Sequence, residues 1–176
     1  MPNSEGHAVM SDLPDDGTQQ KEVFARYGAA VYFAQVLEHG LVNLLIVAKQ
    51  ATGQSTPSSI DDDFEKLFRL TMGALLKQTE KARLTVADTE LWNDALKRRN
   101  RLAHHYFRDH AENFMSPEGR DLMLEDADAA RLLFVEADEA ATRVMFSIGE
   151  AWGMTPDAAR AVFEEMEAEA RKGPKR

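Results

Sequence analysis

The chain has 176 residues and a mass of 19.7 kDa, the usual size of one domain and enough to bury a substantial core. Hydrophobic residues make up 44% and charged residues 29%, which argues against wholesale disorder and against a fibrous protein. The lack of cysteine excludes disulfides, thiolate metal sites and cysteine nucleophiles. The net charge of −9 opposes a long electrostatic footprint on nucleic acid but allows a short local contact.

The two ends of the sequence have their own composition. Residues 1–18 carry four acidic and no basic residues, so we expect a disordered acidic tail, followed by a single helical domain over 19–171 and a basic tail over 172–176. The first residues lack the basic and apolar parts of a secretory signal. The longest apolar runs, 29–34 and 44–48, are much shorter than the roughly 20 residues that span a bilayer. The sequence therefore predicts a cytoplasmic protein with no membrane contact.

Apolar residues three and four positions apart predict the first two helices. The first helix covers 19–51 and has the stripe Phe24, Tyr27, Val31, Ala34, Leu37, Leu41, Leu44 and Ala48. A turn-rich stretch over 52–59 follows it. The sequence Ser59-Ile60-Asp61-Asp62 resembles a capping box and predicts the start of a second helix that ends near Lys81.

Three further helices follow in the second half of the chain. Asp88 or Thr89 can cap a third helix over 89–113. Ser116-Pro117 and Thr155-Pro156 each place a hydroxyl cap before a proline, which predicts helices over 117–152 and 156–171. No stretch alternates apolar and polar residues as a strand does. We therefore predict an all-α, antiparallel up-and-down bundle of four to five helices.

Charge is unevenly distributed along these helices. Residues 117–169 hold fourteen acidic residues against four arginines, a net charge of −10, which predicts a solvated outer face or a surface that repels nucleic acid. Residues 97–108 reverse this pattern with five basic side chains and two of the five histidines. Any contact with nucleic acid is therefore expected at 97–108.

Arg99 occupies an apolar position of the third helix, three residues after Leu96 and three before Leu102. A permanently charged guanidinium at such a position needs a carboxylate, an anionic ligand or access to water. Glu38 is the candidate partner, because it takes the equivalent place on the first helix. One interpretation is a buried Arg99–Glu38 pair that fixes the register of two helices.

Two histidines follow Arg99 on the same helix. His104 lies four residues after Asn100 on the same helix face, within the neighbourhood that a long arginine side chain reaches. His105 has the same spacing to Arg101 and Asp109, which indicates surface salt bridges.

The run Arg99-Asn100-Arg101-Leu102-Ala103-His104 resembles the Arg, polar residue, three residues, His motif of HEPN domains. Its continuation to Tyr106 is similar to the Arg-x4-His-x-Tyr form of bacterial toxins that pair with minimal nucleotidyltransferases. The resemblance implies a dimeric, HEPN-like helical domain over 19–171 and a metal-independent endoribonuclease in which Arg99 and His104 cut RNA. In those toxins the motif ends a shorter chain, whereas 70 residues follow Tyr106 here.

The residue chemistry fits RNA cleavage. His104 titrates in the range needed for proton transfer, and the Arg99 fork matches phosphate oxygens. A base and an acid are both required, so we expect two copies of the chain to share one cleft with two His104 and two Arg99.

The resemblance and the residue chemistry also suggest supporting roles. Asn100 would orient the phosphate or His104, and Tyr106 would stack on a base, accept a nucleotidyl group or simply be a half-buried aromatic. Binding of RNA is assigned to Arg98, Arg101 and His105. No helical His pair or clustered carboxylate motif predicts a metal, and we expect no cofactor.

A second function from a different class is also consistent with the sequence. In this alternative the chain is a non-catalytic helical interaction or regulatory module, with Arg99, Glu38 and His104 as a structural polar network. For the enzyme, the expected partners are a second copy and RNA, with an antitoxin or a nucleotidyltransferase as a protein partner. DNA is not an expected partner, because it lacks the 2′-hydroxyl that metal-free cleavage uses.

Overall fold

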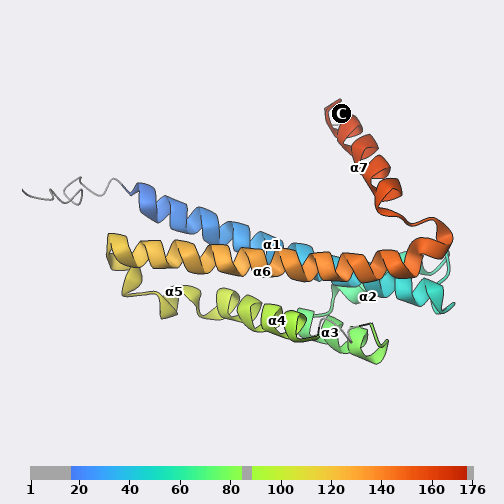
Figure 1. Ribbon diagram of the computed structural model, residues 1–176, viewed down its shortest axis with the longest axis horizontal. Coiled ribbons are helices and arrows are strands. Elements are labelled where there is room, and N and C mark those ends of the chain that lie inside the picture. Colours follow the sequence, from blue (N-terminus) through green and yellow to red (C-terminus); the bar gives the residue numbers. More distant parts are fainter. Residues whose placement is uncertain (1–16, 85–88, 174–176) are drawn as a thin grey trace, which may run out of the picture.

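The computed structural model describes residues 17–84 and 89–173 and folds them into helices joined by turns (Figure 1). No strand occurs in these two ranges, so the all-α prediction is confirmed for them. The N-terminal tail up to residue 16, the proposed cap Asp88 and the last three residues lie outside the described residues. The elements are α1 (Thr18–Ala51), α2 (Ile60–Phe68), α3 (Met72–Lys81), α4 (Thr89–His104), α5 (Tyr106–Asp109), the 3₁₀ turn η1 (Asn113–Met115), α6 (Pro117–Gly149), the 3₁₀ turn η2 (Glu150–Trp152) and α7 (Pro156–Ala170).

The three long helices α1, α4 and α6 form the body of the bundle (Figure 1). α1 and α6 are parallel neighbours, since Gln19 bonds Asp121 and Arg26 bonds Asp128 further along both helices. α4 runs in the opposite direction to both. Successive long helices therefore alternate in direction, as predicted. As a consequence, the first and the third of them, α1 and α6, are parallel. The described ranges contain seven α-helices instead of four or five, because two of the predicted helices are interrupted.

α1 and α6 pack against each other through buried positions that repeat every seven residues. Buried positions recur at alternating intervals of three and four residues on both helices, as in a coiled coil. On α6, four of the positions in this pattern are alanines, and small side chains let two helix backbones approach closely. The buried residues are Val23, Ala30, Ala34, Leu37, Leu41 and Leu44 on α1 and Met123, Ala127, Ala130, Phe134, Ala137 and Ala141 on α6.

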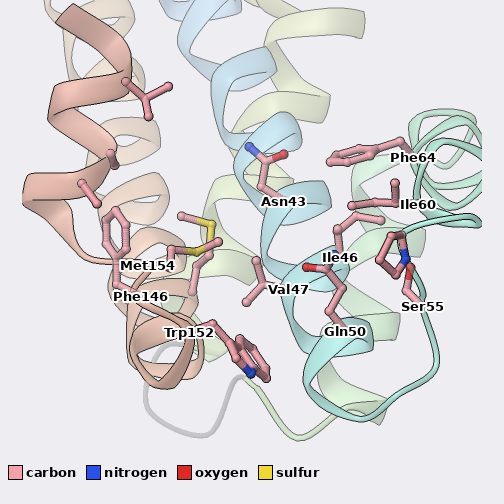
Figure 2. Close-up of a pocket in the computed structure, with 16 residues that line it drawn as sticks. Asn43, Ile46, Val47, Gln50, Ser55, Ile60, Phe64, Phe146, Trp152 and Met154 are labelled. Carbon is pink, nitrogen blue, oxygen red and sulfur yellow. The ribbon is translucent and has the colours of Figure 1, made fainter.

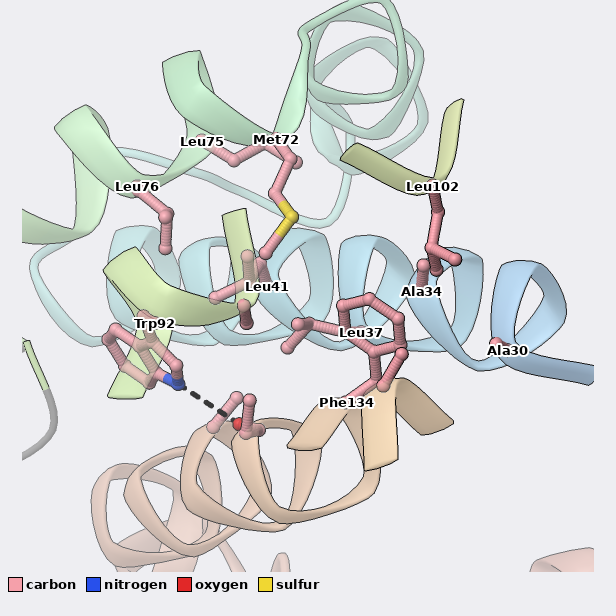
Figure 3. Close-up of a cluster of buried hydrophobic side chains, with 14 of the residues drawn as sticks. Ala30, Ala34, Leu37, Leu41, Met72, Leu75, Leu76, Trp92, Leu102 and Phe134 are labelled. Atoms are coloured by element: carbon pink, nitrogen blue, oxygen red, sulfur yellow. Dashed lines mark hydrogen bonds between the residues drawn. The ribbon is translucent and has the colours of Figure 1, made fainter. Parts of the chain in front are cut away.

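α4 closes the core on one side of this seam. Its buried residues are Trp92, Ala95 and Leu102 (Figure 3). The Trp92 indole Nε1 donates a hydrogen bond of 3.0 Å to the main-chain oxygen of Ala137 on α6. The buried indole is thus satisfied, and α4 is fixed along α6.

The predicted second helix is divided into α2 and α3. Thr71 breaks it, because its side chain accepts a bond from the Ala74 amide and caps α3. The break lets Met72, Leu75 and Leu76 of α3 enter the core. The predicted capping role of Ser59 is wrong, since its side chain bonds Thr56 and caps nothing.

The predicted third helix is also shorter than expected. α4 ends at His104, the backbone breaks at His105, and α5 and η1 complete the segment to Met115. Because of this break, the Tyr106 side chain points into the core. The two Ser/Thr-Pro starts are confirmed, because Ser116 accepts from the Gly119 amide and Thr155 from the Ala158 amide.

α1 is also long and apolar enough to cross a membrane by length and composition, since an 18-residue window has a mean hydropathy of 1.5. Half of that window is buried in the bundle, as in the core helix of a soluble protein. This finding leaves the cytoplasmic location a prediction.

Gly119 should tolerate no larger side chain. A Cβ there would collide with the backbone of Asn113, where η1 packs against the first turn of α6. Replacing Gly119 with Ala should lower the melting temperature, with a loss of about 1–3 kcal/mol typical of overpacking. Gly28→Ala is the matched control, because that site in α1 faces open space and should gain up to about 1 kcal/mol of helix propensity. Thermal unfolding followed by circular dichroism measures both, and equal shifts would contradict the contact.

Candidate functional site

Arg99 lies at a groove between α1 and α4 with a volume of about 240 Å³. Apolar side chains form much of the groove, and Glu38 and Gln35 add polar atoms. Tyr27 closes one end, where its hydroxyl donates a 3.2 Å bond to the main-chain oxygen of Leu102. The groove is lined by Tyr27, Val31, Ala34, Gln35, Glu38, Arg99, Leu102 and Ala103.

The predicted pair of Arg99 and Glu38 is confirmed. Arg99 Nε donates to Glu38 Oε1 at 2.9 Å, and Nη1 makes a longer 3.4 Å contact with the side-chain oxygen Oδ1 of Asn100. The pair is not fully buried, because the two side chains are 32% and 23% exposed. Arg99 Nη2 makes no hydrogen bond to any described residue. One edge of the guanidinium is therefore held by protein and the other is available to an anion.

His104 is exposed at the last residue of α4. Its imidazole makes no hydrogen bond within the described ranges, and its closest aromatic neighbour is the His105 ring at 6.2 Å. It does not line the Arg99 groove. The predicted network of Arg99, Glu38 and His104 therefore forms only in part, with Asn100 in the place expected for the histidine.

Arg98 and Arg101 turn away from this groove toward α6. Arg98 Nη1 bonds Asp126 Oδ1 at 2.5 Å, and Arg101 Nη1 bonds Asp126 Oδ2 at 2.7 Å. Arg101 also contacts Asp109 at 3.3 Å. Both arginines therefore tie α4 to α6, while their side chains stay 30% and 33% exposed, and their assignment to RNA binding stays a prediction.

His110 completes the cluster around Asp126, and sequence reasoning missed both residues. His110 is buried, its Nε2 lies 3.1 Å from Asp126 Oδ2, and its Nδ1 lies 3.0 Å from the side-chain nitrogen Nδ2 of Asn113. Nε2 also lies 3.2 Å from Arg101 Nη2, so the imidazole contacts both the carboxylate and a guanidinium of the cluster. Burial alone would raise the pKa of Asp126, but the bonds from His110, Arg101 and Arg98 outweigh it and hold the pKa below its usual value.

Tyr106 belongs to the core. Its side chain is 1% exposed, and its hydroxyl donates a 2.7 Å bond to the main-chain oxygen of Met123. Burial raises the pKa of this hydroxyl to about 12. A buried ring cannot stack on a base, and a buried, bonded hydroxyl cannot accept a nucleotidyl group. Of the three roles predicted for Tyr106, only that of a structural aromatic remains, and the ring is fully buried instead of half-buried.

An aromatic patch continues from the groove to the surface. The Tyr27 ring lies 4.9 Å from Phe107, which lies 5.6 Å from Phe24. Phe24 is 54% and Phe107 38% exposed, so this end of the bundle presents aromatic faces to solvent beside the exposed His104 and His105. The expected ion pairs of His105 are absent from the described structure, where Asp109 bonds Arg101 and Arg108 instead.

The described ranges contain no group of three or more His, Asp or Glu residues that could hold a metal ion. No family model, curated protein or solved structure matches the chain. The described part of the chain is all-α and is built on a parallel pair of long helices, with an arginine groove on one side of that pair.

The Asp126 cluster should make stability depend on pH in acid. Because the folded pKa of Asp126 is depressed, its contribution is present above the unfolded pKa of about 4 and is lost as pH falls through the folded pKa. Asp126→Asn should lower stability at pH 7 by about 1–3 kcal/mol and weaken the loss of stability in acid.

Asp94→Asn is the control for this prediction. Asp94 pairs with Lys97 on the exposed face of α4, so its loss should cost less than about 0.5 kcal/mol. Urea unfolding of both variants from pH 7 to pH 3 measures the difference. Equal unfolding free energies of the two variants across this pH range would show that the Asp126 cluster does not stabilise the fold.

Proposed function

We propose that the protein is a HEPN-like, metal-independent endoribonuclease that acts in the cytoplasm as a homodimer. The observation that carries the proposal is the exposed imidazole of His104, which has no hydrogen-bond partner among the described residues and ends the helix that holds Arg99 at an open groove. A histidine that served only the fold would be bonded or packed, as His110 is.

The roles follow from what each group offers. His104 transfers the proton of the RNA 2′-hydroxyl or protonates the 5′-oxygen leaving group, and Arg99 Nη2 stabilises the charge of the phosphorane. Glu38 and Asn100 position the guanidinium through their contacts with its Nε and Nη1 atoms.

Two copies are required by the number of groups and by their placement. The motif supplies one histidine per chain, His104, and that residue does not line the groove of its own Arg99. A two-fold axis near the ends of the two α4 helices would supply a second imidazole and a second guanidinium to one cleft.

The surface around His104 suits a short single-stranded RNA contact. The exposed rings of Phe24 and Phe107 offer faces on which unpaired bases stack, and the exposed His105 and Arg108 offer contacts to phosphate. The partly exposed Arg98 and Arg101 remain predicted RNA contacts.

The toxin-like aspect of the proposal concerns the protein partner. An antitoxin that covers the His104 surface remains part of the proposal. A nucleotidyltransferase that modifies Tyr106 does not, because that hydroxyl is buried and bonded to Met123.

The alternative, a non-catalytic interaction or regulatory module, is favoured by a different observation. The Arg99 charge is already balanced by Glu38 within one chain, and the charges of Arg98 and Arg101 are balanced by Asp126 and Asp109 together. In this alternative the basic residues of α4 serve only to hold α1, α4 and α6 in register.

His104→Ala distinguishes the two functions. Because His104 is exposed and unbonded, its removal should leave the melting temperature within about 1 °C of the wild type while reducing RNA cleavage by at least about 100-fold. His39→Ala is the control, since His39 is an exposed histidine of α1 that makes an edge-to-face contact with Phe68, and its loss should not affect cleavage. Fluorogenic RNA cleavage and light scattering are the measurements. Wild-type protein that is monomeric at micromolar concentration, or that cuts no RNA, would support the alternative.

The mechanism also predicts the cofactor requirement and the products. Cleavage should persist in excess EDTA, leave DNA of the same sequence intact, and yield a 2′,3′-cyclic phosphate and a 5′-hydroxyl, because the nucleophile is the 2′-hydroxyl. The rate should be bell-shaped in pH, since one imidazole must be neutral and the other protonated. Phosphate-specific end labelling and mass spectrometry identify the products. Loss of activity in EDTA, or cleavage of DNA, would refute the mechanism.

A further inference from the structure

α7 is an amphipathic helix that the rest of the chain leaves uncovered. It projects from the far end of the bundle, away from the His104 surface (Figure 1), and none of its residues is buried. Val162, Phe163 and Met166 are 58%, 60% and 64% exposed. An isolated helix of 15 residues is marginally stable in water, so this element gains stability from whatever packs against its apolar side.

Beside α7 lies a groove with a volume of about 880 Å³. Figure 2 shows its two sides, α7 with Trp152 on one and Ile60 with Phe64 of α2 on the other, and Ile46 and Val47 of α1 between them. The polar residues in the lining, Asn43, Gln50 and Ser55, are uncharged. The surface that enters this groove must therefore be apolar.

The walls of the groove are acidic outside this apolar lining. Of the ten carboxylates on α2 and in residues 150–170, five are paired within the chain, with Lys49, Arg69, Arg160, Arg171 and Lys172. On the α2 side, Asp61 and Asp62 are exposed and form no ion pair within the described ranges. The same holds on α7 for Glu165, which stands three residues after the lining residue Val162 and therefore flanks the groove. An apolar floor between two acidic walls is complementary to a segment with apolar anchors and cationic flanks.

We propose that this groove binds an amphipathic, basic helix of a partner protein. The helix places its apolar side chains, three and four residues apart, on Ile46, Val47 and Val162, and its Lys and Arg residues beside the carboxylates of α2 and α7. A second copy of α7 is the poorer occupant, because it brings five carboxylates and one arginine to walls that are already acidic. The site shares no lining residue with the Arg99 groove and lies at the other end of the bundle from His104, so it is separate from the proposed nuclease site.

The probe is a synthetic amphipathic helix of about 16 residues with leucines three and four apart and lysines on the flanking positions. The matched control peptide has glutamates in place of the lysines. Trp152 lines the groove and is 57% exposed, whereas Trp92 is buried in the core, so the change in tryptophan emission reports the groove. With the full-length protein, we expect a saturable blue shift with the lysine peptide and at least tenfold weaker binding of the glutamate peptide.

Two variants of α7 separate docking in the groove from general attraction to an acidic protein. Val162→Glu places a charge in the lining and should weaken binding of the lysine peptide at least tenfold, although it makes the protein more acidic. Phe163→Glu is the control, because Phe163 is equally exposed but does not line the groove, and should retain the affinity. Both positions are exposed, so neither change should impair folding.

Three outcomes would overturn the proposal. Equal binding of both peptides would show that the walls do not select charge. Binding that survives Val162→Glu would show that the peptide lies elsewhere. A dimer of the protein alone that Val162→Glu dissociates, detected by sedimentation, would assign the groove to a second copy.

Discussion

The rest of the fold depends on the close parallel packing of α1 against α6. Alanines on the buried face of α6 leave room for the larger leucines of α1, and the two helices stay in contact along most of their length. Gly40 shows how close they are, because a Cβ there would collide with the Asp138 carboxylate. Between two parallel helices the chain must run back in the opposite direction. α4 does so along the seam, which places the segment 98–104 against both long helices.

The position of the candidate site follows from where α4 stops. α4 is held to α6 by Trp92 at one end and by Arg98 and Arg101 at the other. Beyond that point Tyr106 turns inward to reach Met123, and the helix cannot continue in the same direction. His104 is left at the exposed end, outside the hydrogen-bond network. The same constraint thus makes Arg101 structural and leaves His104 accessible three residues later.

The sequence was most informative where one local interaction decides the outcome. The period of three and four predicted α1 almost to the residue, and the hydroxyl-proline pairs predicted the starts of α6 and α7, because a cap needs only the next three residues. The pairing of Arg99 with Glu38 was also predictable, since a charge on an apolar stripe requires a partner on the facing helix. The interruptions at Thr71 and His105 were not, because both serve contacts with distant parts of the chain.

Long-range contacts likewise hid the Asp126 cluster. Arg98 and Arg101 were assigned only to nucleic-acid binding because they stand in a basic run, and their partner lies 28 and 25 residues away on another helix. Asp126 stands beside buried Ala127 on α6, and a carboxylate next to a buried seam was the signal that could have revealed it. Tyr106 was misjudged for a related reason, since its acceptor is a main-chain oxygen, which no side-chain pattern reports.

This neutralisation changes what the basic segment can do. With Arg98 and Arg101 bound to Asp126 and Arg99 held at one edge by Glu38, few of the charges in 97–108 are left for an external phosphate. Binding of RNA through many phosphates is therefore disfavoured, and a strand that binds here must be held by one or two phosphates and by stacking on Phe24 and Phe107. Such a contact depends weakly on salt. It recognises an unpaired, accessible stretch of RNA better than a duplex, because only unpaired bases expose faces for stacking.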